Sequence, residues 1–365
     1  MRQPHPYLSP FPGLDEVEGP DAIVDPAGPG GAPGPGRRWR VLRAAAFYAG
    51  TFAILLVLNF FLPRLLPGDP IRALADPGAA GYVQDGGQRA KLEAYYGLNR
   101  PLGEQFVHYL SGLARGDLGT SIQTQEPVLT VIAQRLPWTL LLIASGLALS
   151  SLVGVSAGIH SGWRRGRSSD RALLVVVLLA RNLPAFFVGT LLLLLFAVTL
   201  GWLPLSGATT PFATMDPLER VGDVIGHLVL PAVTLALSLL GSQYLLMRNS
   251  MVAELGQGYL LLGRAKGLTG RRLKYRHAAR NALLPVVTQM TLELGLAGAA
   301  VTNVLLVERV FAYPGVGGLV FDSVSHRDYP TIAGSFLVLS VMVLAANMVL
   351  DVIYARLDPR TVEAR

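Results

Sequence analysis

Apolar residues gather along this chain into six long runs. The runs are 41–62, 137–159, 172–200, 224–246, 286–306 and 332–353. Crossing the hydrocarbon core of a bilayer takes roughly 20 helical residues, and each run is about that long. Backbone polar groups inside lipid must be satisfied within the segment, and the runs lack the alternation of a barrel strand. The pattern therefore predicts an all-α polytopic membrane protein with six transmembrane helices.

Composition supports a membrane protein rather than a water-soluble globule. Hydrophobic residues make up 51% of the chain and charged residues only 15%, and such a balance fits a soluble domain poorly. The chain has no cysteine, which excludes disulfides, thiolate metal sites and cysteine nucleophiles.

The net charge of +7 comes from basic residues that lie beside the runs, not in a separate basic domain, so the sequence predicts no nucleic-acid partner. Three groups stand out: Arg37, Arg38, Arg40 and Arg43; Arg164, Arg165 and Arg167; and Arg264, Lys266, Arg271, Arg272, Lys274, Arg276 and Arg280. Positive charge favours the cytoplasmic side. The three groups therefore predict six crossings with both termini in the cytoplasm.

Proline and glycine mark the segments between the runs. Residues 1–40 are rich in both and predict a disordered cytoplasmic tail, whereas 41–360 form the transmembrane domain. The long loop 63–136 falls outside, and the helical spacing of its apolar residues in 88–114 predicts short amphipathic helices on the outer face. Pro184 predicts a kink in the third run. The cost of a cation in lipid places Arg181, one turn earlier, at the cytoplasmic interface rather than in a functional role.

No pattern for catalysis stands out. The phosphate-binding pattern Gly-x4-Gly-Lys-Ser/Thr does not occur, so ATP hydrolysis by that route is excluded. The histidines are scattered, without metal-ligand spacing. An intramembrane hydrolase using Ser145 and His227 would need a third group to orient the pair, and none is evident. A secondary carrier would predict inverted repeats and paired buried charges, which the sequence does not display.

The segment 258–285 is basic, punctuated by glycine, and lies between two apolar runs. An apolar face at helical spacing is formed by Leu261, Leu262, Ala265 and Leu268. Arg264 and Lys266 stand beside it, available to acidic groove walls. Gly267 allows a sharp helix stop, and Pro285 is expected to mark the start of the next span. The segment is therefore a candidate docking site for a soluble protein.

Its residue order resembles the cytoplasmic coupling loop of permease subunits in binding-protein-dependent ABC importers, most closely the oligopeptide and dipeptide branch. The resemblance is carried by Arg264-Ala265-Lys266-Gly267, Arg271-Arg272, His277-Ala278, Arg280-Asn281-Ala282 and Leu284-Pro285. Segments 96–121 and 357–360 are also similar to these permeases. The family usually has a small residue and an acidic or polar residue before the glycine, where Leu261, Leu262 and Gly263 stand here. This departure concerns the docking contacts and not the role of the loop.

The resemblance implies the type I permease fold of ABC importers, with a cytoplasmic coupling loop at 248–285. The implied ATPase-coupling residues are Tyr259, Leu261, Leu262, Arg264, Ala265, Lys266, Gly267 and Leu268. It further implies a bacterial inner or plasma membrane location, no cofactor in this chain, and four partners: a second homologous permease, two ATPase subunits that bind ATP and Mg, and an extracytoplasmic solute-binding protein. The implied activity is inward movement of peptides or a similar small solute by alternating access. Nickel-chelate, glutathione and oligosaccharide importers share the fold and remain alternatives.

Polar residues in the fifth run are candidates for the translocation path. Gln289, Glu293 and Asn303 interrupt an apolar helix, and such residues usually face a bundle interior or a water-filled path. Gln289 and Glu293 are four residues apart and share one helix face. Peptide permeases more usually carry a neutral glutamine at position 293, so the acid is expected to favour a cationic solute group. The alternative is a carboxyl group that is hydrogen-bonded inside the bundle without touching solute.

Overall fold

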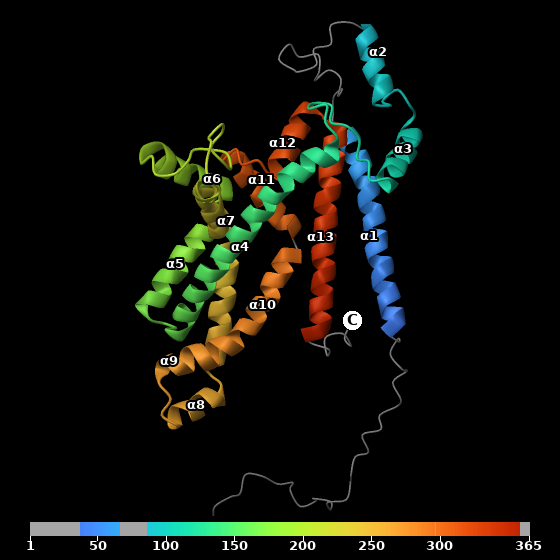
Figure 1. The fold of residues 1–365 in the computed structure, drawn as a ribbon. Coiled ribbons are helices and arrows are strands. Elements are labelled where there is room, and N and C mark those ends of the chain that lie inside the picture. Colours follow the sequence, from blue (N-terminus) through green and yellow to red (C-terminus); the bar gives the residue numbers. More distant parts are fainter. Residues whose placement is uncertain (1–36, 66–85, 296, 358–365) are drawn as a thin grey trace, which may run out of the picture. The chain divides into compact units, whose positions relative to one another are not determined.

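The computed structural model describes residues 37–65, 86–295 and 297–357. The regular secondary structure of these residues is helical (Figure 1). Among them there is no strand, and a lone β-bridge joins Thr120 to Pro127. The chain divides into two compact units, Met1–Ala46 and Phe47–Arg365. In the described part of the first unit, the guanidinium of Arg43 lies over the ring of Trp39. Residues 1–36 of the predicted tail lie outside the described residues.

The helices follow one another along the whole described chain. Their bounds are α1 (Arg37–Leu65), α2 (Gly86–Tyr95), α3 (Leu102–Ala114), α4 (Val128–Trp163), α5 (Ser168–Asn182), α6 (Ala185–Leu192), α7 (Pro217–Glu254), α8 (Gly258–Ala265), α9 (Gly270–Arg272), α10 (Ala279–Gly295), α11 (Ala297–Val310), α12 (Val316–His326) and α13 (Tyr329–Leu357). Two π-helical segments, η2 (Leu193–Thr199) and η3 (Leu273–Ala278), continue α6 and α9. The all-α prediction is confirmed for the described residues.

Three of these helices are long and apolar enough to cross a membrane: α1 over Ala45–Leu65, α4 and α7. The third predicted run becomes a fourth crossing if α5 and the segment Ala185–Thr199 count as one broken span. The fifth run falls on α10 and α11, and the described apolar part of α13, Tyr329–Ala345, is shorter than a full crossing. A multi-pass membrane protein follows, whereas the number six stays a prediction.

The third run is sharply bent, as Pro184 predicted. The axis turns by 101° between α5 and the following helical segment. Pro184 has no N–H to offer and stands as the N-cap of α6, immediately after an extended Leu183. Arg181, in the last turn of α5, is exposed and its stem covers Gly241 of α7, where a Cβ would lie 2.7 Å from the arginine Cδ. Its position at the membrane interface stays a prediction.

Two helices begin before the apolar run that each of them contains. α4 begins at Val128, well before Pro137, which lies inside the helix. Val128 is completely buried in an apolar cluster with residues of α12 and α13, and this burial stabilises the added turns. Likewise, α10 already includes Pro285, because the chain is helical from Gly270 through η3. Proline therefore does not mark the start of either helix.

The short helices predicted on the outer loop are confirmed as α2 and α3. Aromatic rings attach α3 to the end of α1, with the ring of Phe60 5.0 Å from Phe106 and 5.5 Å from Tyr109 between centroids. Arg64 of α1 adds a polar contact, because its Nε donates to Oε1 of Gln105 at 3.2 Å. The loop is thus anchored to α1 at this point.

α4 and α7 lie side by side over much of their length (Figure 1), and glycines allow the approach. A Cβ added at Gly146, Gly154, Gly158 or Gly162 would lie between 2.5 and 2.9 Å from a side chain of α7. Real Cβ atoms do not come so close, so each site requires glycine. Tight packing along four turns makes the two helices one stiff body.

The loops group at the two ends of these helices as the charge pattern predicted. At one end, Asp170 at the start of α5 bonds Arg248 near the end of α7. At the other, the N–H of Gly207 donates to the carbonyl of Phe311 at 2.9 Å, and Asp328 bonds Ser121. The predicted inner loops therefore meet one another, and so do the predicted outer loops. Which end faces the cytoplasm stays a prediction.

Candidate functional site: a coupling helix and its support

The candidate docking segment contains a short helix, α8, that packs with one face on the end of α7 and on η3. Leu260 is 2% exposed and Gly263 is also buried. Leu260 belongs to an apolar cluster with Met247 and Met251 of α7 and Leu273 of η3. A Cβ at Gly263 would stand 2.6 Å from Cδ2 of Leu273, so glycine is needed for this close contact.

The outer face of α8 carries most of the predicted coupling residues. Leu261 and Leu262 are 71% and 56% exposed, and Arg264, Ala265, Lys266 and Gly267 are exposed as well. Leu268 differs, because it is half-buried and packs on the cluster behind α8. Large exposed leucines beside cations are typical of a surface that binds another protein. The docking role of these residues stays a prediction.

Gly267 ends the helix as the sequence predicted. Its φ is +75°, a left-handed conformation that glycine adopts without steric cost. The N–H of Gly267 donates to the carbonyl of Arg264 at 2.9 Å, and the N–H of Leu268 donates to that of Gly263 at 3.1 Å. This pair of bonds is the Schellman arrangement, which satisfies the last carbonyl groups of a helix.

Tyr259 joins α8 to α7. Its hydroxyl donates to a carboxylate oxygen of Glu254, the last residue of α7. Burial, followed by the hydrogen bond to Glu254, raises the pKa of Tyr259, so it remains a neutral donor. Although Tyr259 is 37% exposed, its contact holds the start of α8 against the helix before it.

The basic stretch after Gly267 is helical from Gly270 onward. The Thr269 hydroxyl accepts the N–H of Arg272 and caps this helix. Arg271 and Arg272 are exposed, but Lys274 is only 8% exposed and its Nζ lies over the ring of Tyr275. The continuous helix through η3 and α10 connects the docking segment directly to the predicted fifth span.

Sequence reasoning missed a buried ion pair close to this segment. Asp170 is 1% exposed and binds Arg248 through both oxygens, with the guanidinium Nε and Nη2 at 2.7 and 2.8 Å. The hydroxyl of Ser161 also donates to Asp170 and lies 2.6 Å from the hydroxyl of Tyr244. The available signal was a lone acid in the arginine-rich loop Arg164 to Arg171 and a lone arginine just after the apolar fourth run.

A second buried acid at the opposite end was also missed. Glu308 of α11 is 1% exposed and accepts from the Thr139 hydroxyl at 2.7 Å and from the N–H of Gly318 at 2.9 Å. The Thr139 hydroxyl accepts the N–H of Val316, so both groups cap the start of α12. Gly315 leaves room for this carboxylate, which would stand 2.0 Å from a Cβ there. The dense glycines at 315–318 were the signal.

The structure describes the side chain of only one of the three residues predicted to line the translocation path. The side chains of Gln289 and Glu293 lie outside the described residues, although both belong to α10. Asn303 is half-buried on α11. Lining of a path by these three residues therefore stays a prediction.

The two residues considered for a hydrolase each make local bonds. The hydroxyl of Ser145 donates to the carbonyl of Leu142 at 3.0 Å. Nδ1 of His227 lies 2.8 Å from the carbonyl oxygen of Asp223 and 3.3 Å from its carboxylate. Neither bond forms a nucleophile–base pair. In the part of the chain that the structure describes, no three metal-ligating side chains come together.

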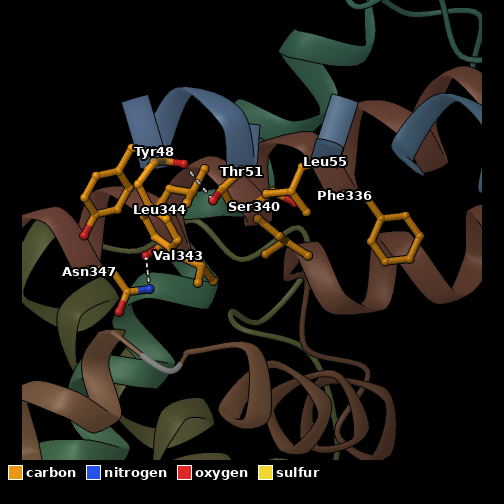
Figure 2. Close-up of a pocket in the computed structure, with 10 residues that line it drawn as sticks. Tyr48, Thr51, Leu55, Phe336, Ser340, Val343, Leu344 and Asn347 are labelled. Carbon is orange, nitrogen blue, oxygen red and sulfur yellow. Dashed lines mark hydrogen bonds between the residues drawn. The ribbon is translucent and has the colours of Figure 1, made fainter. Parts of the chain in front are cut away.

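A hollow of about 520 Å³ lies between α1 and α13 (Figure 2), and none of its ten lining residues belongs to α8. Tyr48, Thr51 and Leu55 form one wall, and Ser340 and Asn347 belong to the other. Thr51 and Asn347 bond backbone carbonyls of their own helices, as the dashed lines in Figure 2 show. The ten lining residues include no charged side chain, so the hollow does not share the polar character of the candidate site.

Comparison with known proteins identifies the family. The model of the family described as "binding-protein-dependent transport system inner membrane component" matches residues 150–363. The chain is 33% identical to the di/tripeptide transport system permease protein of Pseudomonas aeruginosa, over 88% of this chain and 97% of the relative. It is 36% identical to the glutathione transport system permease protein of Escherichia coli, over 85% and 94%.

A Brucella ovis protein whose name describes it provisionally as a peptide permease is 38% identical, over 85% of this chain and 95% of its own length. The family model runs from within α4 through α13 and includes α8. The chain belongs to the family of inner membrane components of binding-protein-dependent transport systems.

Proposed function

We propose that this chain is the permease subunit of an ABC importer that moves peptides, or a closely similar small solute, into the cell. The proposal rests on the two faces of α8. The outer face exposes Leu261 and Leu262, and the inner face packs on the end of α7 and on η3. The names of the relatives, which cite peptide, di/tripeptide and glutathione transport, support a peptide-like solute. Glutathione is itself a small peptide derivative and remains within this class.

The proposed complex contains a second permease, two ATPase subunits and a solute-binding protein. In this arrangement the chain crosses the membrane six times with both termini in the cytoplasm. α8 then lies on the ATPase side, and the anchored outer loop with α2 and α3 faces the binding protein. The family and the basic charge around α8 support this orientation.

The surface of α8 suits a groove on a soluble partner. Its leucines offer apolar contact, and Arg264 and Lys266 offer charges to acidic groove walls. Movement of that partner would be transmitted because Leu260 and Gly263 pack without free space on α7 and η3. ATP binding and hydrolysis would thereby switch the permease between inward and outward states.

A matched pair of glycine variants tests the docking role. Gly267 and Gly270 are both exposed, and a Cβ at either would meet nothing within 4 Å. Gly267 alone has a positive φ, so Gly267→Val strains the end of α8 and Gly270→Val does not. We expect Gly267→Val to abolish uptake in proteoliposomes with normal membrane insertion, and Gly270→Val to transport normally. Normal uptake and ATPase binding by Gly267→Val would refute the proposal.

We further propose that Gln289, Glu293 and Asn303 line the solute path and that the acid favours solutes with a positive group. The helical spacing of Gln289 and Glu293 supports this, because a carboxyl group within an apolar run rarely faces lipid. Glu293→Gln should reduce uptake of cationic solutes more than that of neutral ones, measured in the same vesicles with the same binding protein. An equal loss for both would leave Glu293 with a structural role.

A further inference from the structure

A polar cluster joins three helices close to α8. Asp170 at the start of α5 accepts two bonds from Arg248 of α7, one from the hydroxyl of Ser161 in α4, and one from the N–H of Gly166 at 2.9 Å. The hydroxyl of Tyr244, also on α7, completes the cluster at Ser161. α4 and α7 therefore each contribute at least one partner to the single carboxylate that α5 carries.

The cluster is buried and geometrically rigid. The side chain of Asp170 is 2% exposed and that of Arg248 is 16% exposed. A planar guanidinium that meets a carboxylate through two parallel bonds fixes both distance and orientation. Because buried ions without partners are unfavourable, this pair resists separation.

Close packing extends from the cluster to α8. A Cβ at Gly162 of α4 would stand 2.5 Å from Cβ of Met251 and 2.9 Å from the carbonyl oxygen of Arg248. Met251 belongs in turn to the apolar cluster that holds Leu260 of α8. α8, the end of α7, the end of α4 and the ion pair are thus in continuous contact.

α5 depends on the ion pair more than α4 does. α4 is held to α7 by the four glycine contacts along its length. α5 contacts α7 through an apolar cluster that contains Val177, Leu240 and Tyr244, and its first turn is fixed by Asp170. Beyond α5 the chain turns by 101° at Pro184 and continues as α6, so α5 links the ion pair to this bend.

We propose that Asp170 and Arg248 are positioning residues for transport: they hold α5 to α4 and α7, so that a displacement of α8 moves the three helices as one body. The pair remains closed throughout the transport cycle. Without it, α8 still binds the ATPase, but its movement reaches α7 and α4 without carrying α5. This inference rests on the proposed function of α8.

The test replaces the ion pair by a covalent link that can be removed. Because the chain has no cysteine, Asp170→Cys with Arg248→Cys gives a unique pair for a short bis-methanethiosulfonate cross-linker. Removing both charges together avoids leaving one buried ion unpaired. The complete importer, with cysteine-free partner subunits, is reconstituted in proteoliposomes, and solute uptake and ATP hydrolysis are measured in the same preparation.

We expect the reduced double variant to keep its ATPase subunits and its ATP hydrolysis, while solute moved per ATP falls about fivefold or more and returns after cross-linking. A reductant should reverse the recovery. The single variants treated with the same reagent are the controls and should not recover. Normal coupling in the reduced protein would overturn the inference, and so would a further loss after cross-linking, because the second result means that the pair must open.

Arg248→Lys provides a second variant that keeps the positive charge. Lysine is a point charge without the planar fork, so it cannot hold the carboxylate in both directions. We expect it to lower solute moved per ATP while the complex remains assembled. A protein with full coupling would contradict a positioning role. If Gly267→Val is silent as well, the docking role of α8 fails; if Gly267→Val abolishes uptake, only this inference fails.

Discussion

Asp170 and Asp328 are equally buried, each 1% exposed, but they lie at opposite ends of the bundle and have different partners. Asp170 binds a cation through both oxygens. Asp328, just before α13, accepts from hydroxyl groups of Ser121 and Thr331 and from backbone N–H groups, including that of Ile122 at 3.1 Å. One acid joins three helices of the bundle, and the other fastens the predicted outer loop to the start of α13.

The difference between the partners decides what each site tolerates. An arginine can only donate hydrogen bonds, whereas a hydroxyl can donate or accept. The guanidinium of Arg248 therefore requires that both side-chain oxygens of Asp170 be acceptors. The hydroxyls around Asp328 can reverse their bonds if the carboxylate becomes an amide. The same substitution, Asp to Asn, should therefore lower the free energy of unfolding much more at position 170 than at position 328.

Asp170→Asn is expected to have the larger effect. Each carboxylate oxygen accepts from Arg248, so the amide NH₂ of asparagine must face a guanidinium N–H in either orientation. The buried cation also loses its counter-charge. Removing one partner of a buried pair costs about 3–5 kcal/mol, so the free energy of unfolding should fall by that order. Denaturant titration of the purified protein in detergent measures the change.

The exposed pair Arg309 and Asp322 supplies the control for Asp170→Asn. Its N–O distance of 2.9 Å is similar, but its side chains are 52% and 40% exposed. Solvent screens such a pair, and Asp322→Asn should change stability by about 1 kcal/mol or less. If both variants lose equal stability, burial of Asp170 does not govern the strength of its contact.

The general fold could be predicted from the sequence because membrane crossing depends on local composition. Runs of apolar residues predicted the positions of α1, α4, α7 and the bent α5, and Pro184 marked the bend itself. The exact helix starts could not be predicted in this way. Val128 lengthens α4 through contacts with α12 and α13, residues far away in the chain, and such contacts do not appear in a local pattern.

The candidate site was predictable in part for the same reason. The end of α8 depends on a single local requirement, a left-handed residue, and Gly267 supplies it. The inward turn of Leu268 was missed because it depends on the apolar cluster that includes Leu273. The pairing of Asp170 with Arg248 joins positions 78 residues apart, and a single sequence gives no sign that two lone charges meet.

Asp328→Asn is expected to have the smallest effect and so completes the comparison. The side-chain oxygen of asparagine can accept the N–H groups of Ile122 and Thr331, which now bind the same oxygen of Asp328 at 3.1 and 3.3 Å. The NH₂ group then faces the hydroxyls of Ser121 and Thr331, which can both accept, whereas the N–H of the exposed Gln123, which lies 3.4 Å from this oxygen in Asp328, turns to water. We expect a loss of about 1 kcal/mol or less in the free energy of unfolding.

The matched variant Asp328→Val keeps a similar shape but offers no acceptor. It leaves the buried N–H groups of Ile122 and Thr331 without their partner, and each unsatisfied donor costs about 1–3 kcal/mol. The predicted outer loop should then separate from α13, so a cysteine introduced at Ile122, which is 2% exposed and bonds Asp328 only through its backbone, should react faster with a polar maleimide than in the Asn variant. Both variants therefore carry Ile122→Cys in the labelling assay, and Ile122→Cys alone is the reference. If the Asn variant is as reactive and as unstable as the Val variant, the charge of Asp328 is essential, and hydroxyl partners are no more tolerant than the guanidinium at Asp170.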